Sequence, residues 1–205
     1  MSFQSTNFQT VGAWVSRLLR FDFTVFDEVA AQPSATSGAL IVVFGASVLA
    51  GIGSWLWAIQ FDLGDFSKSE VFIKSLVLGS IIQTFVWFLW VYLAYQVLVR
   101  AYGARVEFAD LVRTMGFAFV PVALNVLIAI NSFAIPFGLV AFGMTLLLTN
   151  TAIQRAANAD AREATVANLT GFAAFVIVMG VFANVLEVRN VGGLAPGILF
   201  FSLDF

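Results

Sequence analysis

The sequence contains no cysteine and no histidine among its 205 residues. Without cysteine the chain can form no disulfide, ligate no iron–sulfur cluster and offer no thiol nucleophile. Without histidine it lacks a common metal ligand, a usual axial ligand of haem and the base of a Ser-His-Asp triad. We therefore expect no enzyme active site, no metal and no cofactor, and we leave a bound lipid open.

Charge is also scarce. Charged residues make up 11% of the chain and hydrophobic residues 60%, with a mean hydropathy of +0.95. The net charge is -2, and no basic tract is present that would bind nucleic acid. The first ten residues hold no Lys or Arg, so we expect no signal peptide. A composition this apolar indicates an integral membrane protein.

Five apolar stretches are long enough to cross a bilayer, and none carries a charge in its middle. They are residues 38–59, 72–99, 111–130, 136–153 and 167–186. Backbone groups in lipid must be hydrogen-bonded within the segment, so each stretch has to be helical. The predicted fold class is all-α: a polytopic transmembrane helical bundle of about five spans with an N-terminal interfacial amphipathic helix.

Three regions follow from this pattern: an N-terminal cytoplasmic or interfacial segment (1–36), the transmembrane bundle (37–187) and an apolar C-terminal tail (188–205). Only five residues (131–135) link the third and fourth stretches. A re-entrant hairpin with three full crossings is therefore an alternative for that part of the chain.

The basic residues predict the orientation. Seven of the ten Lys and Arg fall on one side of the expected spans: Arg17, Arg20, Arg100, Arg105, Arg113, Arg155 and Arg162. The positive-inside rule then places the N-terminus in the cytoplasm and the C-terminus outside. An aromatic run near the inner end of the second span reads as an interfacial belt: Trp87, Trp90, Tyr92 and Tyr95.

An amphipathic helix is expected before the first span. Its apolar stripe has helical spacing: Val11, Trp14, Val15 and Leu18. Arg17 and Arg20 fall on the opposite face, which predicts contact with anionic headgroups. Thr24 and Asp27 resemble a capping box that begins a second short helix.

Two sets of residues inside the spans are candidates for helix contacts. Ala46, Ala50 and Ser54 form a small-xxx-small row, which predicts a packing seam. The polar intramembrane set comprises Gln83, Asn125, Asn150 and Asn184. Such amides usually bridge helices. They would line a polar path only if all four shared one face.

The third span reads Arg113 to Pro121 and contains Gly116, Phe117 and Pro121. A Gly-aromatic pair followed by proline at this place resembles the Yip-domain family of five-span membrane proteins, and the short chain is closer to its prokaryotic members. The proline frees a carbonyl near Phe117, and Gly116 lets a neighbouring helix approach. The resemblance implies residence in the cytoplasmic membrane of a prokaryote.

Three functional hypotheses are consistent with these features. The first is a non-enzymatic Yip-type scaffold acting through protein and lipid contacts. The second is an accessory structural subunit of a larger respiratory or photosynthetic membrane complex, and the third is a passive carrier or pore. Expected partners are membrane lipids and other membrane-protein subunits, and neither nucleic acid nor metal.

Overall fold

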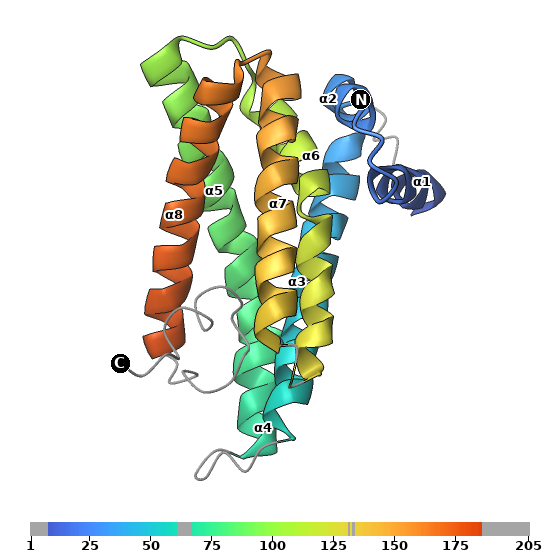
Figure 1. Ribbon diagram of the computed structural model, residues 1–205, viewed down its shortest axis with the longest axis vertical. Helices are drawn as coiled ribbons and strands as arrows, with labels where there is room; N and C mark the ends of the chain where they lie inside the picture. The colour runs from blue at the N-terminus through green and yellow to red at the C-terminus, as the bar shows by residue number, and fades with distance from the viewer. Residues whose placement is uncertain (1–7, 61–66, 131, 133, 186–205) are drawn as a thin grey trace.

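The computed structural model describes residues 8–60, 67–130, 132 and 134–185, and within these ranges it contains helices and the turns between them (Figure 1). The elements are α1 (Phe8–Leu18), α2 (Val25–Ala31), α3 (Ala35–Ala58), α4 (Lys68–Val71), η1 (Phe72–Leu78), α5 (Gly79–Tyr102), α6 (Phe108–Ala118), η2 (Val120–Ala129), α7 (Ala134–Ala157) and α8 (Ala161–Val185). The predicted all-α fold class is confirmed.

Five helical segments are long and apolar enough to span a membrane. They are α3, the continuous run from α4 through η1 to α5, the run from α6 to η2, α7 and α8. The second segment, Lys68–Tyr102, has 35 residues. At about 1.5 Å per residue it measures roughly 50 Å, well beyond a hydrocarbon core of about 30 Å. It therefore extends past the core, and α4 lies at the far end of the molecule in Figure 1.

The third span changes helix type at its proline. The α6 α-helix ends at Ala118, and η2 continues as a ten-residue 3₁₀ helix with Pro121 near its start. Pro121 has no N–H for the carbonyl four residues back, and the chain takes up tighter i→i−3 bonds, such as Val122 N–H to Phe119 O at 3.0 Å. A 3₁₀ helix rises about 2.0 Å per residue, so α6 and η2 together measure about 36 Å. That length suffices for a full crossing, which disfavours the re-entrant hairpin.

The span that contains α6 and η2 lies at the centre of the bundle. In its apolar window 72% of the residues are buried, against 33–44% in the other four spans. α6 contacts α2, α3, α5 and α7, and η2 lies between α3 and α7. Gln60, just after α3, donates to the carbonyls of Leu56 (2.8 Å) and Ala129 (2.7 Å), which fastens the end of η2 to α3.

Aromatic side chains fill the core between α5, η2 and α8. Trp87 and Trp90 are fully buried, and Trp90 packs on Phe119 and Phe175 with ring centroids 6.4 and 5.5 Å apart. The prediction of an interfacial belt is therefore wrong for both tryptophans. A purely apolar sequence pattern cannot separate core from interface for an aromatic residue near a helix end.

The seven basic residues counted above gather at one end of the bundle. The C-terminal ends of α5 and α7 and the N-terminal ends of α6 and α8 lie there with α2, whereas α8 ends toward the opposite end (Figure 1). The sidedness of this end in the membrane stays a prediction. The apolar tail (188–205) lies outside the described residues, as does part of the 131–135 link.

Candidate functional site around the third span

Arg113 of α6 holds the N-terminal segment to the bundle. Its side chain is buried, pairs with Asp110 one turn earlier, and donates from Nη2 to the carbonyl of Ala30 at 2.8 Å. Ala30 lies in the last turn of α2, where carbonyls lack helical partners and the helix dipole favours a cation. The buried guanidinium therefore satisfies the end of α2 and fixes its position over α6.

Gly116 and Phe117, one turn further along, receive two other elements. A Cβ on Gly116 would lie 2.7 Å from Ala39 Cβ, so α3 approaches α6 closely at this point. Phe117 is fully buried, and its ring meets Trp14 of α1 edge-on with centroids 5.4 Å apart. The three motif positions thus have distinct roles: Gly116 contacts α3, Phe117 contacts α1, and Pro121 changes the helix type.

The apolar stripe of α1 packs on the protein. Val11, Trp14 and Leu18 keep only 6%, 5% and 3% exposure and belong to one buried cluster with Phe117, Ala39 and Leu148. Val15 is half-buried beside them. The sequence had assigned this stripe to lipid, and the structure corrects that expectation for the three buried residues.

Arg17 binds within the chain. Its guanidinium contacts Asp22 Oδ2 (2.8 Å), Thr24 Oγ1 (2.9 Å) and both carboxylate oxygens of Glu28 (2.7 and 2.8 Å). We call these four residues the Arg17 clasp. The clasp ties α1 to α2. The sequence had assigned the Arg17 charge to lipid headgroups, but in the structure it pairs with the carboxylates of Asp22 and Glu28. Arg20 is exposed.

The clasp shifts the ionisation of its acidic members. Hydrogen bonds from the Thr24 hydroxyl and then from Arg17 lower the pKa of Asp22 below its ordinary value. The hydrogen bond from Arg17, followed by that from Trp14 Nε1 at 3.2 Å, outweighs desolvation and lowers the pKa of Glu28. Both carboxylates are therefore charged at neutral pH.

The capping box predicted at Thr24 does not form. The Thr24 hydroxyl donates to Asp22 Oδ1 at 2.5 Å and makes no side-chain cap bond to α2. The Thr24 Oγ1 atom that would accept a helix N–H in a capping box accepts instead from Arg17 Nη2 at 2.9 Å, a charged and therefore stronger donor. Asp27 instead pairs with Arg155 of α7 at 3.0 Å, which adds a second link between α2 and the bundle.

A model of the Yip1 domain family matches residues 18–184, which is most of the chain. The chain belongs to the Yip1 domain family. It is accordingly a membrane-embedded protein, and the resemblance carried by Gly116, Phe117 and Pro121 is confirmed at the level of the family. No curated protein and no solved structure matches it.

The Yip1 match begins at Leu18, the last residue of α1, and ends within the last turn of α8. α2 and the whole bundle therefore lie inside the Yip1 domain. Nearly all of α1 precedes it, although the buried side chains of α1 pack against the domain.

The small-residue row lies inside the Yip1 bundle. Ala46, Ala50 and Ser54 are all buried on α3, and the Ser54 hydroxyl donates to Ala50 O at 2.9 Å. Two glycines of α3 mark further close approaches, and of these the sequence reasoning did not single out Gly53. A Cβ on Gly51 would lie 3.0 Å from Leu76 Cα, and one on Gly53 would lie 2.1 Å from Asn125 O.

The four intramembrane amides occupy different environments in the Yip1 domain. Gln83 and Asn125 are buried, and neither Gln83 Nε2 nor the Asn125 amide has a hydrogen-bond partner within the described part of the chain. Asn150 is half-buried and accepts from Thr165 at 3.3 Å, whereas Asn184 is exposed and donates to Gly180 O. They do not share the single face that a pore would need.

A fifth amide links three spans and was missed. Asn168 of α8 accepts from Trp90 Nε1 of α5 (3.1 Å) and donates to Leu146 O of α7 (2.9 Å). Gly171, one turn later, allows this approach, since a Cβ there would lie 2.5 Å from Trp90 O. The sequence signal was the pair Asn168 and Gly171, a polar residue and a glycine three positions apart in an apolar helix, which is typical of a helix contact.

Nothing in the described ranges groups three or more Asp and Glu residues in a metal-binding arrangement. The acidic and basic side chains around the third span serve instead to hold α1 and α2 on the bundle.

Proposed function

We propose that this Yip1 domain protein is a non-enzymatic membrane scaffold. Its bundle holds the α1–α2 segment in one position at the cytoplasmic end, where the segment contacts other membrane-associated proteins. The observation that carries the proposal is the double attachment of α2, by Arg113 to Ala30 and by Arg155 to Asp27. One charge-assisted hydrogen bond and one ion pair, from different spans, hold a seven-residue helix that is too short to be stable alone.

The exposed end of α2 is the surface that we assign to partners. Ala31, Gln32 and Pro33 are exposed where the chain turns from α2 into α3. A turn held rigidly at both sides presents its side chains at low entropic cost, which favours binding. The proposal includes residence in the cytoplasmic membrane of a prokaryote with this end in the cytoplasm, as the excess of basic residues there supports.

Site-specific photo-crosslinking in native membranes tests the proposal. A photoreactive residue replaces Gln32 at the presented turn, and a matched variant carries it at Leu147, which is 72% exposed on the outer face of α7. A scaffold gives discrete protein adducts from position 32 and mainly lipid adducts from position 147. An accessory subunit instead gives a stoichiometric adduct with a larger membrane subunit from position 147. That result would overturn the proposal.

A flux assay tests the remaining alternative. Gln83→Leu and Asn125→Leu remove the two buried amides and leave the docked segment untouched. A scaffold keeps its position-32 adducts in both variants, and vesicles containing the wild-type protein are no leakier to small polar solutes than empty vesicles. Leakage that the variants abolish would favour a carrier.

A further inference from the structure

The exposed side of α1 and the turn after it carry three large apolar side chains. Phe8, Leu19 and Phe21 are 73%, 61% and 67% exposed. They are separate from the buried stripe of Val11, Trp14 and Leu18, which packs on the bundle. An apolar group of this kind next to a membrane-spanning bundle needs a cover other than water.

The helical geometry of α1 gives this apolar side a direction. At about 100° per residue, Phe8 and Leu19 lie within about 20° of each other and about 160–180° from Arg17. Leu19 still follows the helical path, because its N–H donates to Val15 O at 3.0 Å. Half-buried Val15 lies on the same side.

The Arg17 clasp relates that direction to the membrane. Arg17 binds Glu28 of α2, and α2 lies nearer the end of the bundle than α1 does (Figure 1). The opposite side of α1, with Phe8 and Leu19, therefore points along the long axis of the bundle, away from that end and toward mid-membrane depth. α1 contacts α3 and lies level with its first turns, where Ile41 and Phe44 are already exposed on the spanning helix. The exposed side of α1 thus continues the lipid-facing surface of α3.

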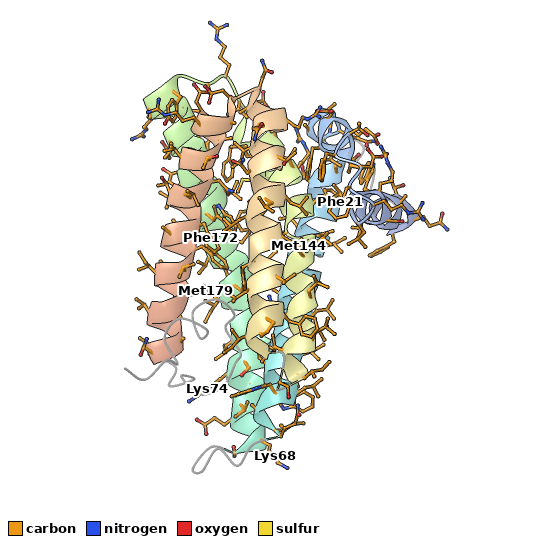
Figure 2. The ribbon with its side chains drawn as sticks, viewed as in Figure 1. Phe21, Lys68, Lys74, Met144, Phe172 and Met179 are labelled. Carbon is orange, nitrogen blue, oxygen red and sulfur yellow. The ribbon has the colours of Figure 1, made fainter. Side chains whose placement is uncertain are left out.

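Phe21 is held outward by a backbone that a phenylalanine rarely adopts. Its φ is 62°, in the left-handed region, which costs a non-glycine residue energy. The turn is fixed by Asp22 N–H to Arg17 O (3.0 Å) and by the clasp contact of Asp22 with Arg17. The Phe21 ring meets Phe23 edge-on, and Phe23 in turn stacks on the buried Phe26. Figure 2 labels Phe21 beside the bundle, level with α1.

We propose that Phe8, Leu19 and Phe21 form a lipid-inserting surface through which α1 lies in the cytoplasmic leaflet, with Arg20 at the headgroup phosphates. The apolar side chains enter the acyl boundary while the buried stripe stays on the protein. Arg20 is exposed beside them and supplies a cation for anionic headgroups. The inference does not depend on the scaffold role, since it concerns lipid and not a protein partner.

The cysteine-free chain allows a direct test, because one introduced cysteine is the only labelling site. Full-length Leu19→Cys and Phe21→Cys carry a nitroxide in nanodiscs of phosphatidylcholine with phosphatidylglycerol. Thr10→Cys is the matched control, because Thr10 is exposed on the same helix about 20° from Arg17 and about 180° from Leu19. We expect labels at 19 and 21 to be more accessible to oxygen than to a water-soluble paramagnetic nickel complex, and the label at 10 to show the reverse.

Two outcomes would overturn the inference. One is equal access of the nickel complex to labels at 10, 19 and 21 in nanodiscs. The other is protection of 19 and 21 in native membranes but not in nanodiscs, because a protein would then cover this surface. Labels that insert in phosphatidylcholine alone and deepen with phosphatidylglycerol, with the deepening lost in Arg20→Gln, would support both the apolar contact and the cation's role.

Discussion

Replacing Gly53 by alanine should separate α3 from η2. A Cβ at position 53 would lie 2.1 Å from Asn125 O and 2.7 Å from Val126 Cα. Both atoms belong to the backbone, so no side-chain rotation relieves the clash. Ordinary contact begins at 3.4 Å, and the difference, 3.4 − 2.1, requires the two helices to move apart by about 1.3 Å.

The magnitude follows from the loss of packing. Overfilling a close-packed site costs about 1–3 kcal/mol, and a gap of about 1 Å forfeits up to half of the dispersion energy of the atoms that line it. Because η2 is also fastened between α3 and α7, we place Gly53→Ala at about 2–3 kcal/mol of unfolding free energy. At about 1.4 kcal/mol per factor of ten, this is about a 30- to 150-fold change in the unfolding equilibrium.

Gly45→Ala on the same helix is the control, since a Cβ at position 45 would meet nothing within 4 Å. Reversible unfolding in mixed micelles of mild and denaturing detergent, followed by tryptophan fluorescence, compares the two variants with the wild type. Gly45→Ala should be neutral or slightly stabilising, because alanine favours the helix. Equal stability of Gly53→Ala and Gly45→Ala would refute the close approach of α3 and η2.

Three further predictions concern the docked segment and the bundle. Arg113→Gln leaves the Ala30 carbonyl without its charged donor and should cost about 2 kcal/mol, less than the roughly 3–5 kcal/mol of a fully buried ion pair because Asp110 is partly exposed. Maleimide labelling of a cysteine at position 29, which is fully buried on α2, should speed up in this variant, and Arg113→Lys should restore part of the protection. Asn168→Leu strands Trp90 Nε1 in the core and should cost about 1 kcal/mol in the same micelle assay, with a changed tryptophan emission. The pKa values of Asp22 and Glu28 are lowered in the folded protein, so the clasp contributes fully to stability above their ordinary pKa values of 3.8 and 4.5, and the contribution is lost as pH falls through the lowered values. Backbone amide exchange in α1, corrected for its intrinsic pH dependence, should therefore rise only below about pH 4.5. A rise near neutral pH would contradict the assignment.

The predicted spans agree with the structure because lipid imposes a simple rule on sequence. A stretch that must be apolar and helical over about 30 Å is visible in composition alone. Each spanning segment begins a few residues before its predicted start, as at Ala35, and α5 and α7 also end later than predicted, because interfacial residues continue the helix without adding hydrophobicity. The Gly116 and Pro121 pair was readable for a similar reason, since each residue has a specific backbone consequence.

The faces of the helices were less predictable. In a membrane protein the core and the lipid-facing surface are both apolar, so Trp90 in the core and Phe85 at 70% exposure look alike in sequence. The same ambiguity put the stripe of Val11, Trp14 and Leu18 against lipid rather than against Phe117. Contacts between segments far apart in the chain, such as Arg113 with Ala30, depend on tertiary placement that periodicity does not encode.

Cross-linking α2 to α7 tests most directly the claim that the bundle holds the N-terminal segment in one place. Asp27→Cys with Arg155→Cys replaces a pair whose side chains meet at 3.0 Å, in a chain with no other cysteine. Asp27→Cys with Lys68→Cys, whose second position is at the far end of the bundle, is the control. A short bis-maleimide should join 27 to 155 rapidly and almost completely in native membranes and leave the control pair unjoined. Failure to join 27 to 155, or equal yields from both pairs, would contradict a docked segment and remove the basis of the proposed scaffold.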